Sequence, residues 1–167
     1  MSKRIYLLCG PAGSGKSTWA KKNAHPDTDV IISRDEIRFS IVKEDEEYFS
    51  HENAVFDRFI TKIRWCMNAE DYESVFIDAT HLTKQSRSKI LHKLYLKDVD
   101  IIPVVFRTSL SKCLEWNSGR SGRARVPDDV VTNMYNSFVE PNFNEFFTYS
   151  KIIYVHENGS EVEVSNG

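Results

Sequence analysis

The residues from Gly10 to Ser17 read G-P-A-G-S-G-K-S and constrain the fold of this chain more than any other segment. They follow an apolar run over residues 5–9 and precede residues typical of a first helical turn, so the order is strand, glycine loop, helix. Glycines permit positive φ angles and bring bare backbone N–H groups close to phosphate oxygens, and the positive end of the helix dipole adds to the attraction. The motif therefore predicts a loop that binds a nucleoside triphosphate.

Parts of this loop have expected partners on the nucleotide. Lys16 is expected to reach the β- and γ-phosphates of ATP, and the Ser17 hydroxyl is expected to ligate Mg²⁺. The nucleotide-binding residues predicted from the motif are Gly10, Ala12, Gly13, Ser14, Gly15, Lys16, Ser17 and Thr18. A Gly/Ser-rich turn that only caps a helix is the alternative, and the preceding strand together with the G-K-S-T spacing argues against it.

Length and composition indicate a single domain over residues 1–167. A chain of 167 residues that is 41% hydrophobic can bury one well-formed core but is short for two. Its three cysteines form no C-x-x-C pair and no even set, so a disulfide framework is not expected. The N-terminal apolar run is too short for a signal peptide, and no segment approaches the length of a membrane span, so no membrane partner is expected. The expected location is a reducing cytoplasm, which is that of the host cell if a phage encodes the chain.

The charge is balanced overall but uneven along the chain. A net charge of −2 excludes a uniformly basic protein that coats nucleic acid. Between Arg107 and Arg125, however, five cations stand against Glu115 alone. A polyanion is therefore expected to bind at a local patch of the surface.

An acid and an arginine stand one helical turn apart after the second predicted strand. Residues 29–32 are typical of a short strand, and S-R-D-E at 33–36 opens a helix as a capping box. Asp35 and Arg38 lie on the same face of this helix and are candidate site residues. The alternative is that Asp35 only complements the helix dipole and that Arg38 is an ordinary solvated side chain.

A second acid, Asp78, ends the buried strand predicted over residues 75–78. An acid at the carboxyl end of a strand beside a phosphate loop is placed to hold Mg²⁺, directly or through water, and capping the next turn is the alternative. The helix predicted over residues 83–96 carries Arg87 on its outward face. Arg87 is expected either to reach a phosphate or to be an exposed surface residue.

Residues 117–127 alternate small residues with arginines after the fourth predicted strand. Such a segment is mobile enough to close and basic enough to hold phosphate, as a lid must. We expect a lid over about residues 110–127, with Arg120, Arg123 and Arg125 as its cations. A flexible solvated loop, or a patch that meets some other polyanion, is the alternative.

Strands alternate with helices along the whole chain. This alternation predicts an α/β fold of the P-loop NTPase type, with a parallel sheet of about five strands, helices on both of its faces and a short edge strand near the C-terminus. The carboxyl ends of parallel strands meet at one edge of a sheet. The phosphate loop, Asp35, Asp78 and the arginine-rich lid should therefore meet at that edge.

Together these segments resemble the P-loop kinase branch that includes the kinase domain of bacteriophage 5′-polynucleotide kinase/phosphatase and the bacterial RNA-repair kinases. The matching pieces are G-P-A-G-S-G-K-S-T, S-R-D-E-I-R at 33–38, I-D-A-T at 77–80, N-S-G-R at 117–120 and V-P at 126–127. They span most of the chain up to about Phe138, in the expected order. The phosphate loop is general to the superfamily, whereas the D-x-x-R pair combined with an arginine lid is more specific.

The resemblance implies transfer of the ATP γ-phosphate to the 5′-hydroxyl of RNA or DNA, as in nucleic-acid end repair. By this resemblance Asp35 is the general base for the incoming 5′-hydroxyl, and Arg38 holds the nearest phosphate of the acceptor. Lys16, Arg120 and Arg123 would neutralise charge on the transferring group, with Arg120 also contacting ATP. The implied acceptor-binding residues are Asp35, Arg38, Thr80 and Arg87.

The lid departs from the family pattern, since it has one extra residue and three arginines. Arg120, Arg123 and Arg125 are therefore alternatives for the lid cation that contacts the transferring phosphate. The chain also lacks a D-x-D-G-T phosphatase motif, so processing of 3′ ends is not predicted.

Two other classes of function stay open. Adenylylsulfate kinases also carry D-x-x-R after the second strand, and antibiotic kinases and zeta-type toxins share the scaffold, so a small-molecule kinase, a nucleotide-sugar kinase included, is one alternative. A small-molecule kinase needs a closed pocket, whereas a polynucleotide kinase needs an open groove with further cations. A nucleotide-switched binding protein without an acceptor is the other alternative, and Asp35 argues against it. The sequence assigns no oligomeric state.

Overall fold

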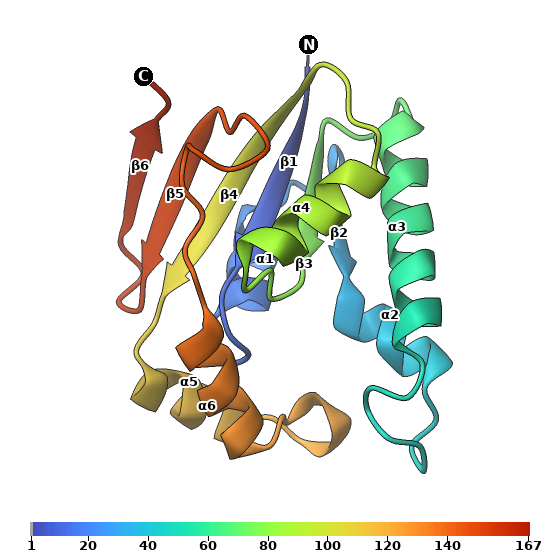
Figure 1. The fold of residues 1–167 in the computed structure, drawn as a ribbon, viewed down its shortest axis with the longest axis vertical. Coiled ribbons are helices and arrows are strands. Elements are labelled where there is room, and N and C mark those ends of the chain that lie inside the picture. Colours follow the sequence, from blue (N-terminus) through green and yellow to red (C-terminus); the bar gives the residue numbers. More distant parts are fainter. Residues whose placement is uncertain (1) are drawn as a thin grey trace.

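A six-stranded sheet runs through the protein in the computed structural model, which describes residues 2–167 (Figure 1). The strands are β1 (Lys3–Cys9), β2 (Asp29–Ser33), β3 (Ser74–Asp78), β4 (Val99–Arg107), β5 (Lys151–His156) and β6 (Glu161–Ser165). Their order across the sheet is β2-β3-β1-β4-β5-β6, and every neighbouring pair is parallel except β5 and β6. The antiparallel β6 is the predicted edge strand, and the five parallel strands confirm the predicted fold class.

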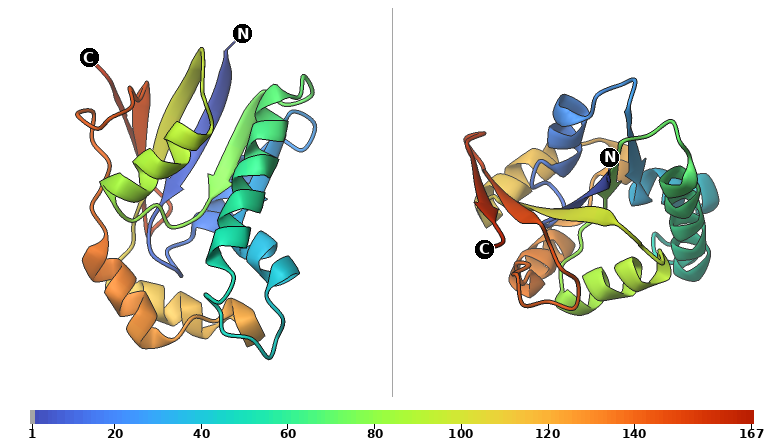
Figure 2. Two further views of the ribbon diagram at one scale, coloured as in Figure 1. Left: turned by 45° about the vertical axis from the view of Figure 1, so that its right-hand side comes forward. Right: turned by 90° about the horizontal axis from the view of Figure 1, so that it is seen from above.

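Helices cover both faces of the sheet (Figure 2). The helices are α1 (Lys16–Asn23), α2 (Arg34–Ile41), α3 (Glu52–Asn68), α4 (Lys84–Lys93), α5 (Leu110–Ser118) and α6 (Asp128–Ser137), with a 3₁₀ turn, η1, at Gly122–Ala124. Seen from above, α1 lies on one side of the sheet, while α3 and α4 lie on the other (Figure 2). This two-sided cover explains why the central strands read as continuous apolar runs.

The strand β1 divides its side chains between two cores, because successive residues of a strand point to opposite faces. Ile5, Leu7 and Cys9 join the larger core, which α3 closes with a helical stripe that includes Val55, Phe59 and Ile63. Leu8 joins the core under α1, where Trp19 and Phe106 meet edge to face with ring centroids 6.0 Å apart. Burial on both faces fixes the register of β1 against its neighbours.

The carboxyl ends of β1 to β4 meet at one edge of the sheet, the lower edge in Figure 1. Below this edge lie α2, the segment that follows it, and the pair of helices α5 and α6 with η1 between them (Figure 1). A third apolar cluster joins that helix pair to the glycine loop through Ala12, Cys113, Val126 and Val131. The fold therefore gathers the predicted functional segments at a single edge.

The three cysteines, Cys9, Cys66 and Cys113, are buried free thiols. Burial raises the pKa of the Cys9 thiol to about 12, so it is a small apolar core residue at neutral pH. Between residues 2 and 167, no helix combines the length and the apolar character that crossing a bilayer requires.

Candidate active site

The glycine loop joins β1 to α1, and two of its glycines occupy conformations that other residues rarely adopt. Gly13 has φ 78° and Gly15, which caps the N-terminus of α1, has φ 99°. A Cβ atom on Gly13 would lie 2.3 Å from the backbone oxygen of Cys113 in α5, which is far inside van der Waals contact. Glycine at position 13 is therefore required both by backbone conformation and by the close approach of α5.

Polar groups inside the loop are arranged to receive an anion. The Ser14 hydroxyl is buried and has no hydrogen-bond partner among the described residues, although buried polar groups are normally paired. Lys16 is buried, and its ammonium donates to the Pro11 carbonyl at 2.8 Å across the loop. Burial lowers the pKa of Lys16, Asp78 acts in the opposite direction, and Arg120 acts in the same direction as burial. An unpartnered buried donor, a buried ammonium and a helix N-terminus together fit the phosphates of a nucleotide.

Two oxygen ligands suited to Mg²⁺ lie beside the loop. The Ser17 hydroxyl donates to Asp78 Oδ2 at 2.7 Å, and the Asp78 side chain is buried at the end of β3. Within residues 2–167, no group of three or more His, Cys, Asp or Glu side chains is arranged to hold a metal ion. Because Mg²⁺ is usually held by one or two carboxylates together with substrate phosphates, Ser17 and Asp78 fit this ion.

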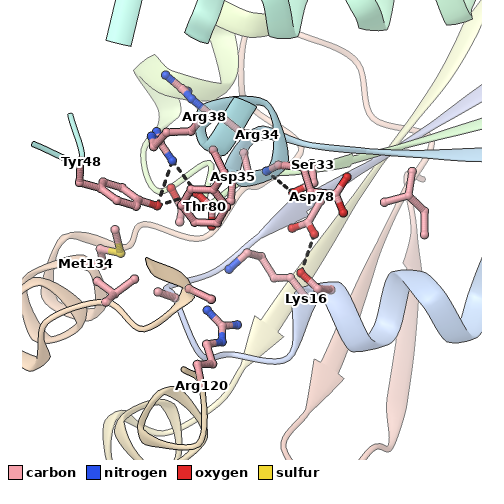
Figure 3. Close-up of a pocket in the computed structure, with 18 of the residues that line it drawn as sticks. Lys16, Ser33, Arg34, Asp35, Arg38, Tyr48, Asp78, Thr80, Arg120 and Met134 are labelled. Carbon is pink, nitrogen blue, oxygen red and sulfur yellow. Dashed lines mark hydrogen bonds and ion pairs between the residues drawn. The ribbon is translucent and has the colours of Figure 1, made fainter. Parts of the chain in front are cut away.

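A cavity of about 430 Å³ opens over the loop and contains most of the predicted site residues. The predicted residues that line it are Ala12, Lys16, Ser17, Asp35, Arg38, Asp78, Thr80 and Arg120. Figure 3 shows Asp35, Arg38 and Tyr48 on one side of the cavity, with Lys16 and Arg120 on the other. The edge of the sheet thus brings a carboxylate and the phosphate-loop lysine to one cavity.

The Asp35 carboxylate is held in place by two donors on the same oxygen. The Tyr48 hydroxyl donates to Asp35 Oδ1 at 2.6 Å, and Arg38 donates to the same atom at 2.5 Å. Asp35 stands in the first turn of α2, which begins after Ser33, and the Ser33 hydroxyl accepts from the backbone N–H of Glu36. Half of the Asp35 side chain stays exposed toward the cavity, so it can meet a ligand.

Arg38 is buried and is fixed by a carboxylate from another helix. Both oxygens of Glu52, in the first turn of α3, accept from Arg38 at 2.9 and 3.2 Å. Arg34 donates to Glu52 as well, at 3.2 Å. Burial works against the Arg38 charge, but the interactions with Glu52, Tyr48 and Asp35 together exceed this effect and raise its pKa. The alternative of a solvated Arg38 is therefore wrong.

The three lid arginines occupy three different places. Arg120, just after α5, lines the active-site cavity (Figure 3). Arg123, in η1, instead donates to the Val42 carbonyl and lies over the Phe39 ring, 4.7 Å from its centroid. Arg125 is exposed and, together with the half-buried Arg123, lines a neighbouring groove. In the described structure Arg123 therefore does not lie beside Lys16 as expected, whereas Arg120 lines the same cavity as Lys16.

The expectation for Arg87 is also wrong. Its side chain is fully buried, pairs with both oxygens of Glu145 at 3.0 and 2.7 Å, and donates to the His81 carbonyl at 2.8 Å. Arg87 does not line the cavity, so it neither reaches an acceptor phosphate nor lies on the surface. It instead ties α4 to the segment before β5.

Of the two predicted threonines, Thr80 lies in the cavity wall and Thr18 lies outside it. Thr80 lines the cavity, and its carbonyl accepts from the Gly10 N–H at 2.9 Å, which links the end of β3 to the glycine loop. Thr18 is exposed in the first turn of α1 and is not part of the cavity wall.

The sequence analysis missed two residues of the site, Tyr48 and Glu52, and one pairing that shapes the lid. Tyr48 and Glu52 hold Asp35 and Arg38 from outside α2. Asn117 is fully buried at the end of α5, where its side chain donates to the Val126 carbonyl at 2.6 Å and accepts from the Val126 N–H at 3.0 Å. Asn117 lies within the N-S-G-R segment, so its position was marked in the sequence, but its pairing with Val126 was not.

Comparisons with known proteins identify the family and the fold. A family model described as an AAA domain, AAA_33, matches residues 5–141. The chain is similar to a solved structure of the Pnkp1/Rnl/Hen1 RNA repair complex, with 21% identity and a TM-score of 0.68, over 81% of this chain and 44% of that chain. The chain thus spans less than half the length of that protein.

Two further structures share the fold. One is a fungal RNA kinase, with 14% identity and a TM-score of 0.66 over 93% of this chain and 74% of that chain. The other is a gluconokinase from Sinorhizobium meliloti 1021, with 17% identity and a TM-score of 0.53 over 92% of this chain and 82% of that chain. Proteins of this fold therefore include kinases of different substrates.

Proposed function

The chain belongs to the AAA_33 family of P-loop kinase domains, and on that premise we propose that it transfers the γ-phosphate of ATP to the 5′-hydroxyl end of RNA or DNA. The observation that carries the proposal is the Asp35 carboxylate, which lines the same cavity as Lys16 and is oriented by Tyr48 and Arg38. A kinase that phosphorylates an alcohol needs a base at this place, whereas a nucleotide switch does not.

In the proposed reaction the acceptor oxygen attacks the γ-phosphorus while Asp35 accepts the hydroxyl proton. The new oxygen–phosphorus bond forms as the bond between the γ-phosphorus and the β,γ-bridging oxygen breaks, and ADP leaves. Lys16 and Arg120 supply positive charge to the transferring group from the side of the cavity opposite Asp35. Mg²⁺ held by Ser17 and Asp78 would neutralise charge on the β- and γ-phosphates.

Arg38 is proposed to hold the acceptor phosphate nearest the 5′ end. Its guanidinium lines the cavity beside Asp35, and Glu52 fixes its orientation with two hydrogen bonds. Guanidinium groups recognise phosphate through directed N–H donors as well as through charge. A phosphate at Arg38 would therefore place the adjoining 5′-hydroxyl near the base.

A small-molecule kinase is the second candidate, because a cavity of about 430 Å³ lies within the ~300–1,000 Å³ typical of small-ligand pockets. The gluconokinase among the similar structures acts on such a substrate by its name. The polynucleotide acceptor is favoured because Arg38 supplies a phosphate-binding group beside the base and because a second groove adjoins the cavity.

Phosphorylation of a 5′-hydroxyl oligonucleotide with γ-labelled ATP and Mg²⁺ tests the proposal. We expect the protein to label this acceptor and not one that already carries a 5′-phosphate. Asp35→Asn should lower labelling by about 100-fold or more, since general base catalysis contributes about 10²–10⁴-fold, while ATP binding is retained. Asp57→Asn, the same substitution at an exposed residue of α3 that does not line the cavity, is the matched control.

The outcomes separate the two candidates. Labelling of adenylylsulfate or a sugar with no labelling of any oligonucleotide would favour the small-molecule kinase. Equal rates for Asp35→Asn and the unchanged protein would remove Asp35 from the chemistry and with it the proposed mechanism.

A further inference from the structure

A second groove, of about 250 Å³, adjoins the active-site cavity. One wall is the segment after α2, which contributes Val42 and Phe49, and the other is the end of the lid and the start of α6, which contribute Arg125 and Pro127. Tyr48, Phe49 and Val126 line both spaces, so the groove lies directly beside the cavity that contains Asp35.

The two walls of the groove are tied together. Arg123 in η1 donates to the Val42 carbonyl and lies over the Phe39 ring, which links the lid to the end of α2. On the lid side, Asn117 holds Val126 by two hydrogen bonds. These contacts set the width of the groove in the described structure.

The groove offers an aromatic face beside apolar side chains. The Phe49 side chain is 52% exposed, and its ring meets Tyr48 edge to face at 4.6 Å between centroids. Val126, Pro127 and Val130 form the opposite wall. An exposed aromatic ring that faces an apolar wall can hold a flat aromatic group between them.

The charges of the groove are mixed. Arg125 is exposed, and in the part of the chain that the structure describes its side chain makes no ion pair or hydrogen bond. Glu44 is exposed as well, whereas Glu46 is occupied by His51 at 2.5 Å and by the backbone N–H of Lys43 at 3.0 Å. A site for phosphate alone would not carry these carboxylates, but a nucleobase has amino donors for a carboxylate and a neighbouring phosphate for an arginine.

We propose that this groove binds the nucleobase of the second nucleotide of the acceptor, by stacking on Phe49, with the following phosphodiester near Arg125. The inference rests on the proposed function, because the first nucleotide must present its 5′-hydroxyl to Asp35 in the adjoining cavity. The volume of the groove is below the ~300–1,000 Å³ of typical small-ligand pockets, which suits one ring system rather than a whole nucleotide. The acceptor is therefore a single strand of at least two nucleotides at its 5′ end, because a paired base could not leave its helix to enter the groove without unstacking.

The test compares an acceptor that has a second nucleobase with an acceptor that lacks one. For each protein, kcat/KM is measured with a nucleoside 3′-monophosphate and with a 5′-hydroxyl trinucleotide, and the ratio of the two values is taken. Phe49 also lies 5.4 Å from the Arg38 guanidinium, but any effect on Arg38 acts on both acceptors and cancels in the ratio. The variants are Phe49→Ala, Phe49→Leu, which keeps an apolar side chain, and Trp65→Ala as a control at an exposed aromatic residue of α3.

We expect the unchanged protein to prefer the trinucleotide. Both Phe49 substitutions should lower the trinucleotide preference by about 5- to 150-fold, which corresponds to the ~1–3 kcal/mol of base–aromatic stacking, while Trp65→Ala leaves it unchanged. If both Phe49 variants keep a trinucleotide preference within twofold of that of the unchanged protein, the groove does not bind the second nucleobase, and the proposed function still stands. If the unchanged protein phosphorylates neither acceptor, both the proposed function and the proposed nucleobase site are wrong.

Discussion

Stability should fall on mild acidification because of a single buried histidine beneath the active site. His81 follows β3, its side chain is buried, and Nδ1 donates to the Leu8 carbonyl at the end of β1. Nε2 is buried without a partner, so a proton added there would have no acceptor. Burial is the main reason that the pKa of His81 is lowered from 6.5 to about 3, and the charges of Arg34, Arg87 and Lys16 add to it.

The direction of the effect follows from proton binding in the two states. Below pH 6.5 the unfolded chain protonates His81, whereas the folded protein does not until about pH 3, so the unfolded state binds more protons in this window. The stabilisation is fully present above pH 6.5 and is lost as the pH falls toward 3. Because the pKa of His81 is 6.5 in the unfolded chain and about 3 in the folded protein, the free energy of unfolding falls by about 2 kcal/mol between pH 8 and pH 5.

Urea unfolding at pH 8 and at pH 5 measures this loss. The variant His81→Asn removes the titration, tolerates the positive φ of 44° at this position, and keeps an amide donor for the Leu8 carbonyl. Between the two pH values, the free energy of unfolding should fall by about 2 kcal/mol more in the unchanged protein than in His81→Asn, because all other titrating groups are common to both. His25→Asn, at an exposed histidine, is the control and should behave like the unchanged protein. An equal loss in His81→Asn and the unchanged protein would refute the reasoning.

Two further substitutions test the site. Tyr48→Phe removes the hydroxyl that donates to Asp35, and a hydrogen bond to a charged group contributes about 1.5–3 kcal/mol. We therefore expect kcat in the oligonucleotide assay to fall about 10- to 150-fold while ATP binding is kept. An unchanged kcat would contradict a positioning role for Tyr48. Gly13→Ala places a methyl group 2.3 Å from the Cys113 backbone oxygen and should weaken ATP binding, measured by calorimetry, by about tenfold or more. Gly159→Ala is its control, because Gly159 also has a positive φ, 89°, but has open space around it; similar ATP affinities for the two variants would argue against the steric reason.

Features that depend on neighbouring residues in the chain could be predicted from the sequence. The glycine loop, the helix after it and the start of α2 at Ser33 are determined by short segments whose backbone conformation and capping groups are local. The parallel sheet follows from the alternation of apolar runs with amphipathic segments, and it carries Asp35 and Asp78 to one edge. The shared edge could therefore be predicted before any contact was known.

Features that depend on distant pairing could not be predicted. Arg87 has the helical spacing of an outward-facing residue, yet its partner Glu145 lies 58 positions further along the chain, and nothing in the local pattern marks that pair. The lid arginines differ because of the turn between α5 and α6: Arg120 follows directly after Gly119, whereas Arg123 falls within η1 and turns toward α2. Their roles depend on a turn whose geometry is set by Asn117 and Val126.

The hydrogen bonds of Arg38 suggest an indirect part for Glu52 in the proposed binding of the acceptor. An arginine has five N–H donors, and in Arg38 two go to Glu52, one to Asp35 and one to Tyr48. The fifth, on the terminal nitrogen that also contacts Glu52, is left for a phosphate. Since the guanidinium is planar, fixing two of its nitrogens on the Glu52 carboxylate fixes the direction of that last donor. The Glu52 carboxylate of α3 therefore orients both the proposed phosphate contact of Arg38 and the proposed base Asp35 through one rigid guanidinium group.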